Sequence, residues 1–213
     1  MYSALSTRPD IAYAASALAQ YSSNPGMAHW SAAIQVLQYL VDTSQYKLRL
    51  GGGDRINVQI FSDADWAGQP YDGAKSMTGG VVMVAGGAIA WCSRRQSTVA
   101  TSSMESEFIA LVSAAAAARW IQQLLQEIGM SDKQPIPIFV DNQAAIDYCK
   151  NETNSNRTRH FNIKYHFVRD EVAQKHIEIE KIASENQIAD IMTKPLDRSL
   201  FLKQMNQLMD TGK

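Results

Sequence analysis

The segment INVQIFSDAD (residues 56–65) decides the fold, because it has the pattern of a strand that ends in acidic residues. Ile56, Val58 and Ile60 alternate with other residues up to Phe61, as expected of a strand that buries one face. A glycine-rich turn precedes it. We therefore predict that a sheet begins here.

The residues that follow predict two further strands and then an alternation of helices and strands. Glycines 86 and 87 separate strands near 79–85 and 88–93, which favours an antiparallel meander. A long helix follows, with Ser102 or Ser103 to cap its start and Gly129 to close its end. The remaining expected elements are a strand at 136–140, helices at 142–150 and 161–172, a strand at 177–179, and helical segments at 186–193 and 197–209.

This order predicts an α/β protein. Strands joined by hairpins pair antiparallel, whereas strands separated by helices pair parallel, so we expect a mixed sheet with helices packed on its faces. The first fifty residues differ, since apolar residues at helical spacing predict two helices, over about 9–21 and 28–42, that form a hairpin. We divide the chain into a helical segment, 1–50, and an α/β domain, 51–213.

Composition limits the class of protein. The chain has 213 residues, a net charge of −1 and two cysteines, Cys92 and Cys149, in no metal-binding spacing. We expect free thiols in a reducing compartment, hence an intracellular protein. The longest apolar run, 113–118, is far shorter than the ~20 residues of a membrane span, so no membrane partner is expected. Any polyanion must be held by local cations, and 153–169 is the most basic window.

Four acidic residues occupy positions that secondary structure would bring together: Asp63, Glu107, Asp141 and Asp190. Two of them follow strands, and sites in open sheets assemble where strands end. Carboxylates crowded there repel one another unless hard cations such as Mg²⁺ lie between them. Four acids suit two ions, about 4 Å apart, that clamp an in-line displacement at phosphorus. Each acid by itself also fits a helix cap or an exposed position.

Several segments, in order, resemble the ribonuclease H domain of copia-type LTR retrotransposon polyproteins. They are FSDADWAG (61–68), AKSMTGG (74–80), AIAWCSRRQSTVATSSMESEFIAL (88–111), FVDNQAAI (139–146), RTRHFNIKYHFVRDEV (157–172) and NQIADIMTKPL (186–196). Residues 8–40 resemble the part of the family that joins reverse transcriptase to ribonuclease H. The resemblance therefore covers nearly the whole chain.

The resemblance implies a ribonuclease H fold with a five-stranded mixed sheet, and hydrolysis of the RNA strand of an RNA–DNA hybrid with two Mg²⁺ ions, for which Mn²⁺ can substitute. It assigns catalysis and metal binding to Asp63, Glu107, Asp141 and Asp190. Glu105 is also available, but residues two apart on a helix point about 200° apart, so one glutamate at most faces the metals, and we favour Glu107. The implied partner is the polymerase domain of the same polyprotein, in the cytoplasm, within a virus-like particle, or in the nucleus.

Substrate contacts are expected from polar side chains beside these acids and from cations. Reading an RNA strand requires contacts to 2′-hydroxyls across a minor groove. The residues assigned to the hydroxyls and phosphates are Ser102, Ser103, Asn142 and Gln143; those assigned to the DNA backbone are Arg94, Arg95 and Gln96; and those assigned to further phosphates are Arg157, Arg159 and Lys164.

Two other readings remain open. Asp63 and Asp65 form an Asp-x-Asp pair that resembles those of haloacid-dehalogenase phosphatases and metal-dependent glycosyltransferases, although neither explains the later acids. A catalytically weak domain that binds hybrids or docks on a polymerase also fits. Cellular ribonucleases H carry a histidine in the loop before the last acid, and 182–186 has none.

Overall fold

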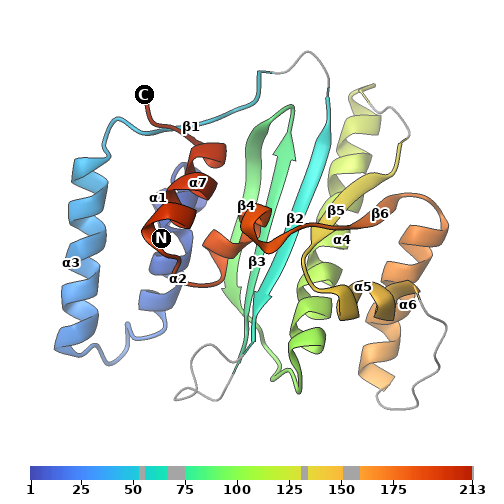
Figure 1. Cartoon of the computed structure of the whole chain (residues 1–213), viewed down its shortest axis with the longest axis horizontal. Helices are drawn as coiled ribbons and strands as arrows, with labels where there is room; N and C mark the ends of the chain where they lie inside the picture. The colour runs from blue at the N-terminus through green and yellow to red at the C-terminus, as the bar shows by residue number, and fades with distance from the viewer. Residues whose placement is uncertain (53–55, 67–74, 131–133, 151–158, 213) are drawn as a thin grey trace.

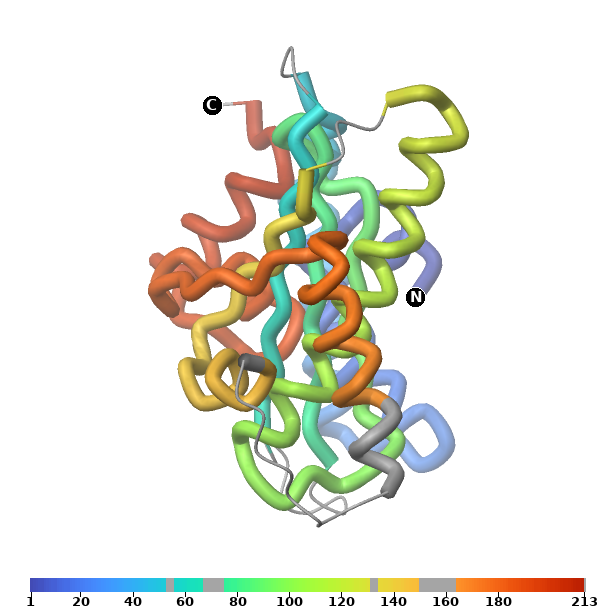
Figure 2. Tube along the Cα trace, turned by 90° about the vertical axis from the view of Figure 1, so that its right-hand side faces the viewer, coloured from blue at the N-terminus to red at the C-terminus, as the bar shows by residue number. Residues whose placement is uncertain are grey.

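The computed structural model describes residues 1–52, 56–66, 75–130, 134–150 and 159–212, without the side chains of 150 and 159–163. Figure 1 shows the central sheet, with the N-terminal helices to one side of it. Seen after a quarter turn, α4 and α6 lie on one side of the sheet and α7 on the other (Figure 2).

The main sheet has the strand order β4-β3-β2-β5-β6. Its strands are β2 (Val58–Asp65), β3 (Met77–Val84), β4 (Gly87–Arg95), β5 (Ile136–Val140) and β6 (Ile177–Lys181). β2 pairs antiparallel with β3 and β3 with β4, whereas β2 pairs parallel with β5 and β5 with β6. The five-stranded mixed sheet predicted from the sequence is confirmed, and β2 is its central strand.

One face of the sheet carries α4 (Ser103–Glu127), α5 (Gln143–Lys150) and α6 (Arg159–Ala173). The Ser102 side chain accepts a hydrogen bond from the Glu105 backbone, and Gly129, at φ 73°, ends the helix, as predicted. Phe108 and Leu111 of α4 are fully buried against strand residues such as Ile60. The long helix thus covers the middle of the sheet.

α4 is also long and apolar enough to cross a membrane, judged by length and composition alone. Its most apolar 18-residue window has a mean hydropathy of 1.4, and 44% of that window is buried inside the protein. It forms a large part of the core on its face of the sheet. Core helices of proteins that span no membrane commonly meet the same criterion.

The opposite face carries η2 (Ser184–Asn186), η3 (Ile188–Met192) and α7 (Arg198–Leu208). The helical segment expected at 186–193 is present as the 3₁₀ helix η3, and the 3₁₀ helix η2 directly precedes it. Every residue of η3 is buried, so the chain turns tightly under the sheet instead of presenting one helical face. Ile188, Ile191 and Met192 form a second core with Phe61 and Val81.

The N-terminal residues form α1 (Tyr2–Ser6), η1 (Pro9–Ile11), α2 (Ala12–Ala19) and α3 (Met27–Asp42), the last two as predicted. β1 (Lys47–Leu48) pairs antiparallel with β7 (Met209–Asp210), which the sequence did not indicate. The indole nitrogen of Trp91 in β4 donates to the Ala4 carbonyl at 2.7 Å, so α1 touches the main sheet. The division at residue 50 remains a prediction.

α3 is the outermost helix of the N-terminal segment (Figure 1). No residue of it is buried, and Met27, Trp30, Leu37 and Val41 are each more than half exposed. The C-terminal end of α3 is tied to the preceding segment, because Arg8 donates to Thr43 and Tyr39 donates to Asp10, and Arg8 and Asp10 form a buried ion pair at 2.7 Å.

Candidate active site

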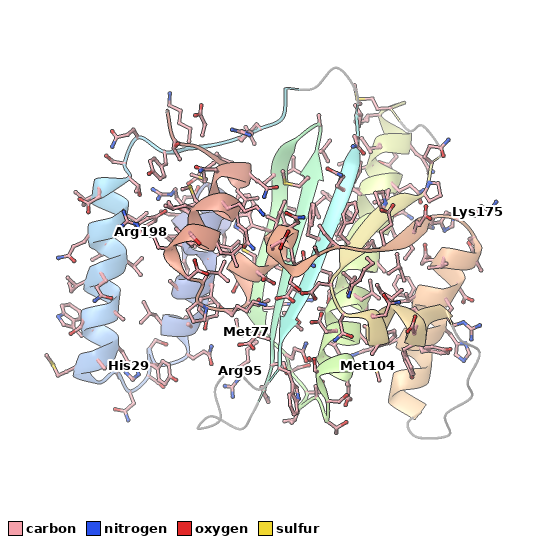
Figure 3. The ribbon with its side chains drawn as sticks, in the orientation of Figure 1. His29, Met77, Arg95, Met104, Lys175 and Arg198 are labelled. Carbon is pink, nitrogen blue, oxygen red and sulfur yellow. The ribbon has the colours of Figure 1, made fainter. Side chains whose placement is uncertain are left out.

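Three carboxylates converge where β2, α4 and β5 meet. One oxygen from each of Asp63, Glu107 and Asp141 lies within 4.8 Å of the others. Asp63 lies on β2, Asp141 directly follows β5, and Glu107 lies in the second turn of α4. Because β2 and β5 are parallel neighbours, their carboxyl ends meet at one edge. The start of α4, at Met104, lies at the same end of the sheet as Arg95 at the end of β4 (Figure 3).

Burial and mutual repulsion perturb Glu107 strongly. The residue is 5% exposed, and its Oε2 atom has no hydrogen-bond partner in the described part of the chain. Desolvation, followed by the charges of Asp63 and Asp141, raises the pKa of Glu107 to about 9. A buried carboxylate oxygen without a partner is costly to maintain. This atom therefore points to a ligand from outside the chain.

The fourth acid, Asp190, lies on η3 and adjoins Asp63 from the other face of the sheet. It is 3% exposed, and desolvation, followed by the charge of Asp63, raises its pKa to about 7. Lys194 lies between the two acids, with Nζ at 2.9 Å from Asp190 Oδ1 and 3.6 Å from Asp63 Oδ2. Asp190 therefore lies close to Asp63, and the Lys194 ammonium contacts both carboxylates.

Hydrogen bonds hold the carboxylates in place. The Thr193 hydroxyl donates to Asp63 Oδ2 at 2.5 Å, and Thr193 is fully buried. The Ser184 hydroxyl donates to Asp141 Oδ2 at 2.8 Å, and the Lys181 ammonium donates to the Asp141 backbone carbonyl. Each acid that follows a strand is therefore oriented by residues from the C-terminal part of the chain.

A glycine makes the approach of η3 possible. A Cβ atom at Gly79, which pairs with Asp63, would lie 2.5 Å from Thr193 Cγ2 and 2.8 Å from the Ala189 carbonyl. These distances are shorter than real Cβ contacts. Only glycine at this position lets η3 bring Asp190 against the central strand.

The two glutamates of α4 have different surroundings. Glu105 Oε2 accepts hydrogen bonds from the Thr101 backbone at 2.6 Å and from its hydroxyl at 2.5 Å. Glu105 therefore stabilises the start of α4 and is not part of the acidic cluster, which contains Glu107. The geometry favours Glu107, as the sequence reading did.

The small polar residues predicted to read the RNA lie beside the acids. Ser102 and Ser103 begin α4, and the Asn142 amide lies 3.4 Å from the Ser103 hydroxyl. Asn142 also accepts a hydrogen bond from the Ala145 backbone and so caps α5. Gln143 is exposed and donates to Asp147 at 2.8 Å.

The residues after β4 differ in exposure. Arg94 is exposed and donates to Ser113 of α4 at 2.8 Å, and Arg95 is half-buried. Gln96 is 4% exposed, and its amide donates to the Thr78 hydroxyl and the Ser106 carbonyl, each at 3.0 Å. The structure thus uses Gln96 inside the protein, to join β3 to α4.

The basic window is described only in part. Arg157 lies outside the described residues, and Arg159 begins α6 without a described side chain. Lys164 is exposed on α6. No described contact joins Lys164 to the acids.

The sequence reading missed Thr193, Ser184 and Lys194, which contact the predicted acids. One signal was available for Lys194, because it stands four residues after Asp190, the spacing at which opposite charges pair on a helical turn. Thr193 and Ser184 lie far along the chain from Asp63 and Asp141, and no local pattern relates them.

A mixed sheet in the order β4-β3-β2-β5-β6, with clustered acids at the end of its central strand, defines a ribonuclease H-like domain. No family model matches the chain. It is 38% identical over 201 residues to the retrovirus-related Pol polyprotein of transposon TNT 1-94 from Nicotiana tabacum, covering 94% of this chain and 15% of that protein. It is 35% identical over 195 residues to the retrovirus-related Pol polyprotein of transposon RE2 from Arabidopsis thaliana, covering 92% of this chain and 13% of that protein.

The chain therefore belongs to the Pol polyprotein family of copia-type retrotransposons and spans about one seventh of the length of these relatives. A solved structure with a similar chain path is LC11-RNase H1 in complex with an RNA/DNA hybrid. The TM-score is 0.49 at 14% identity, covering 64% of this chain and 94% of that one.

Proposed function

We propose that this domain is an endoribonuclease that hydrolyses the RNA strand of RNA–DNA hybrids with two divalent cations during retrotransposon reverse transcription. The observation that carries the proposal is the convergence of Asp63, Glu107 and Asp141 within 4.8 Å, with one Glu107 oxygen buried and unpartnered. Such crowding of carboxylates is costly unless cations offset it. An acid cluster with no ligand would therefore be a liability to the fold.

The donor set fits Mg²⁺, because every candidate ligand is a carboxylate oxygen and hard cations prefer oxygen ligands. Asp63, Glu107 and Asp141 would hold one ion, and Asp63 with Asp190 would contribute to a second. Bound ions would supply an activated water and would neutralise charge at the phosphate that is cut. Mn²⁺, which has similar ligand preferences, should substitute for Mg²⁺.

The chain's own residues orient these ligands. Thr193 fixes Asp63 through its hydroxyl, and Ser184 fixes Asp141. Orientation by such partners is typical of metal sites, where ligands seldom act without hydrogen-bonded support. The site thus has both the ligands and the residues that hold them still.

Substrate contacts follow from what surrounds the acids. Ser102, Ser103, Asn142 and Gln143 would hydrogen-bond 2′-hydroxyls and phosphates on the RNA strand, and Arg94 and Arg95 would contact the DNA backbone. Gln96 is left out of this proposal because its amide is buried. Arg157, Arg159 and Lys164 would add phosphate contacts that weaken as salt rises.

The context proposed for the domain is the polyprotein. The polymerase domain of the same polyprotein would present the hybrid, in the cytoplasm, within a virus-like particle, or in the nucleus. The helical segment 1–50 would lead from that polymerase domain into the ribonuclease domain 51–213.

The test is cleavage of a hybrid carrying a labelled RNA strand. With Mg²⁺, the purified chain should cut that RNA to leave 3′-hydroxyl and 5′-phosphate ends, and it should spare single-stranded RNA and duplex DNA. Asp63→Asn should abolish cutting while the chain stays folded, because the acid is a ligand and its loss relieves repulsion. If the folded wild-type chain bound hybrid but never cut it, with Mg²⁺ or Mn²⁺, the domain would be a binding module instead.

A further inference from the structure

Lys194 occupies a position where a cation is needed. Its ammonium lies 2.9 Å from Asp190 Oδ1 and 3.6 Å from Asp63 Oδ2, and these carboxylates are 4% and 2% exposed at their side chains. A charge between two buried carboxylates interacts strongly with both, because water screens it little. Lys194 therefore offsets the repulsion between Asp63 and Asp190.

The backbone fixes Lys194 in this position. The Thr193 and Lys194 amides both donate to the Asp190 carbonyl, at 3.1 and 3.2 Å. Thr193 is anchored in turn to Asp63 through its hydroxyl, and Pro195 follows directly. The ammonium is thus held against the acids by the same turn that carries Asp190.

On the other side of Asp63, the cations of the described residues do not contact the carboxylates: the Lys181 ammonium donates to the Asp141 backbone carbonyl, and Lys194 acts on Glu107 and Asp141 through its charge alone. Among the described residues, no ion pair is formed by Glu107 or by the Asp141 carboxylate, and Glu107 Oε2 has no partner. The Lys194 side chain is 35% exposed, so it is the most accessible member of this group. The Glu107 and Asp141 carboxylates therefore have no ion-pair partner among the described residues, whereas Lys194 occupies the position beside Asp63 and Asp190.

We infer that Lys194 is a resident counter-ion that competes with the second divalent cation for Asp63 and Asp190, so that the chain without substrate binds one metal ion. The second ion binds when the ammonium leaves those carboxylates. This inference deepens the proposed function and rests on it, because it concerns the loading of the same metal site.

The test counts Mn²⁺ ions bound to the full chain without hybrid, by electron paramagnetic resonance of free Mn²⁺ and by calorimetry. The wild-type chain should bind one ion. Lys194→Met should bind two, with an affinity for the second raised about tenfold or more, since a positive charge is removed from the second position. Lys194→Arg keeps the charge and should bind one. Lys203→Met is the matched control, because Lys203 contacts Glu185 and Asn186 outside the site.

Thermal melting separates competition from a merely structural role. Without metal, Lys194→Met should melt below wild type, because Asp63 and Asp190 then repel without a cation between them. Saturating Mn²⁺ should restore most of the difference. A loss of stability that persists unchanged in saturating Mn²⁺ would assign Lys194 a purely structural role and overturn the inference.

The numbers of Mn²⁺ ions bound also distinguish a failure of this inference from a failure of the proposed function. Two ions on the wild-type chain, or one ion on a folded Lys194→Met chain, would overturn the inference and leave hybrid cleavage untouched. A wild-type chain that takes up no Mn²⁺ would remove the metal chemistry of the proposed function and the inference with it.

Discussion

Asp63 has two kinds of neighbour, one on each side. Glu107 and Asp141 approach it from regular elements of the main sheet and its long helix, and their carboxylates form no ion pair with the described residues. Asp190 approaches from a short 3₁₀ helix and brings Lys194 with it. Crowded carboxylates can thus be stabilised in two ways, by a cationic side chain of the same protein or by a metal ion bound from solution. The side without an ion pair among the described residues is where a metal ion should bind first.

The largest effect is expected from a substitution at Glu107, whose carboxylate forms no ion pair with the described residues. Glu107→Gln should lower hybrid cleavage on the order of 100-fold or more, because it removes a charge that holds the metal at the reacting phosphate. The matched control is Glu105→Gln, which should cost about 1 kcal/mol of stability as a weakened helix start but leave cleavage near wild type. Cleavage rates and melting of both variants check this. Loss of cleavage in the Glu105 variant alone would reverse the assignment.

The next largest effect is expected at Gly79, against which η3 packs with Asp190. Gly79→Ala should destabilise the chain by about 1–3 kcal/mol, because the added Cβ overlaps Thr193 and the Ala189 carbonyl and pushes η3 away. Gly80→Ala is the control on the opposite face, where the nearest atom, Cys92 Sγ, lies at 3.2 Å and the cost should be smaller. Denaturant unfolding measures both. Equal stability of the two variants would mean that η3 tolerates the displacement.

A third prediction concerns pH in the presence of a chelator. In the folded chain the pKa of Glu107 is raised to about 9, from an ordinary 4.5, so between these values the folded state binds a proton that the unfolded state has released. The free energy of unfolding should therefore fall as pH rises through this range. Asp190, with a pKa raised to about 7, adds to the fall at the lower end. Glu107→Gln should flatten the profile above pH 7, and an equally steep profile would contradict this assignment.

The smallest effect concerns the support of Asp141. Ser184→Ala removes one hydrogen bond, which is exposed, and should weaken Mn²⁺ binding by about tenfold or less, equivalent to about 1 kcal/mol. Ser22→Ala loses a comparable exposed bond to the Ala19 carbonyl, far from the acids in sequence, and should leave Mn²⁺ binding unchanged. Calorimetry of the two variants makes the comparison. Equal Mn²⁺ affinities would show that Ser184 does not orient Asp141.

Most helices and strands were predictable from the sequence, because they depend on local patterns of residues. The strand at 136–140 and the start of α4 at Ser103 follow from alternation and from capping, which need only neighbouring residues. The positions of the four acids at the ends of strands and on helices singled them out, and the resemblance assigned them catalysis and metal binding. Burial of Gln96 was not predictable, because a polar residue after a strand looks exposed until a helix packs over it.

The sequence by itself determined the elements, their order and the acidic residues at the ends of strands, because hydrophobic period and turn chemistry act over a few residues. Tertiary structure alone decided that Thr193 bonds to Asp63 and that β1 pairs with β7, and it placed Glu107, which the sequence already favoured over Glu105, beside the other acids. These contacts join residues far apart in the chain, or depend on the rotation of a packed helix. They are set only when the layers close and bury the charges together.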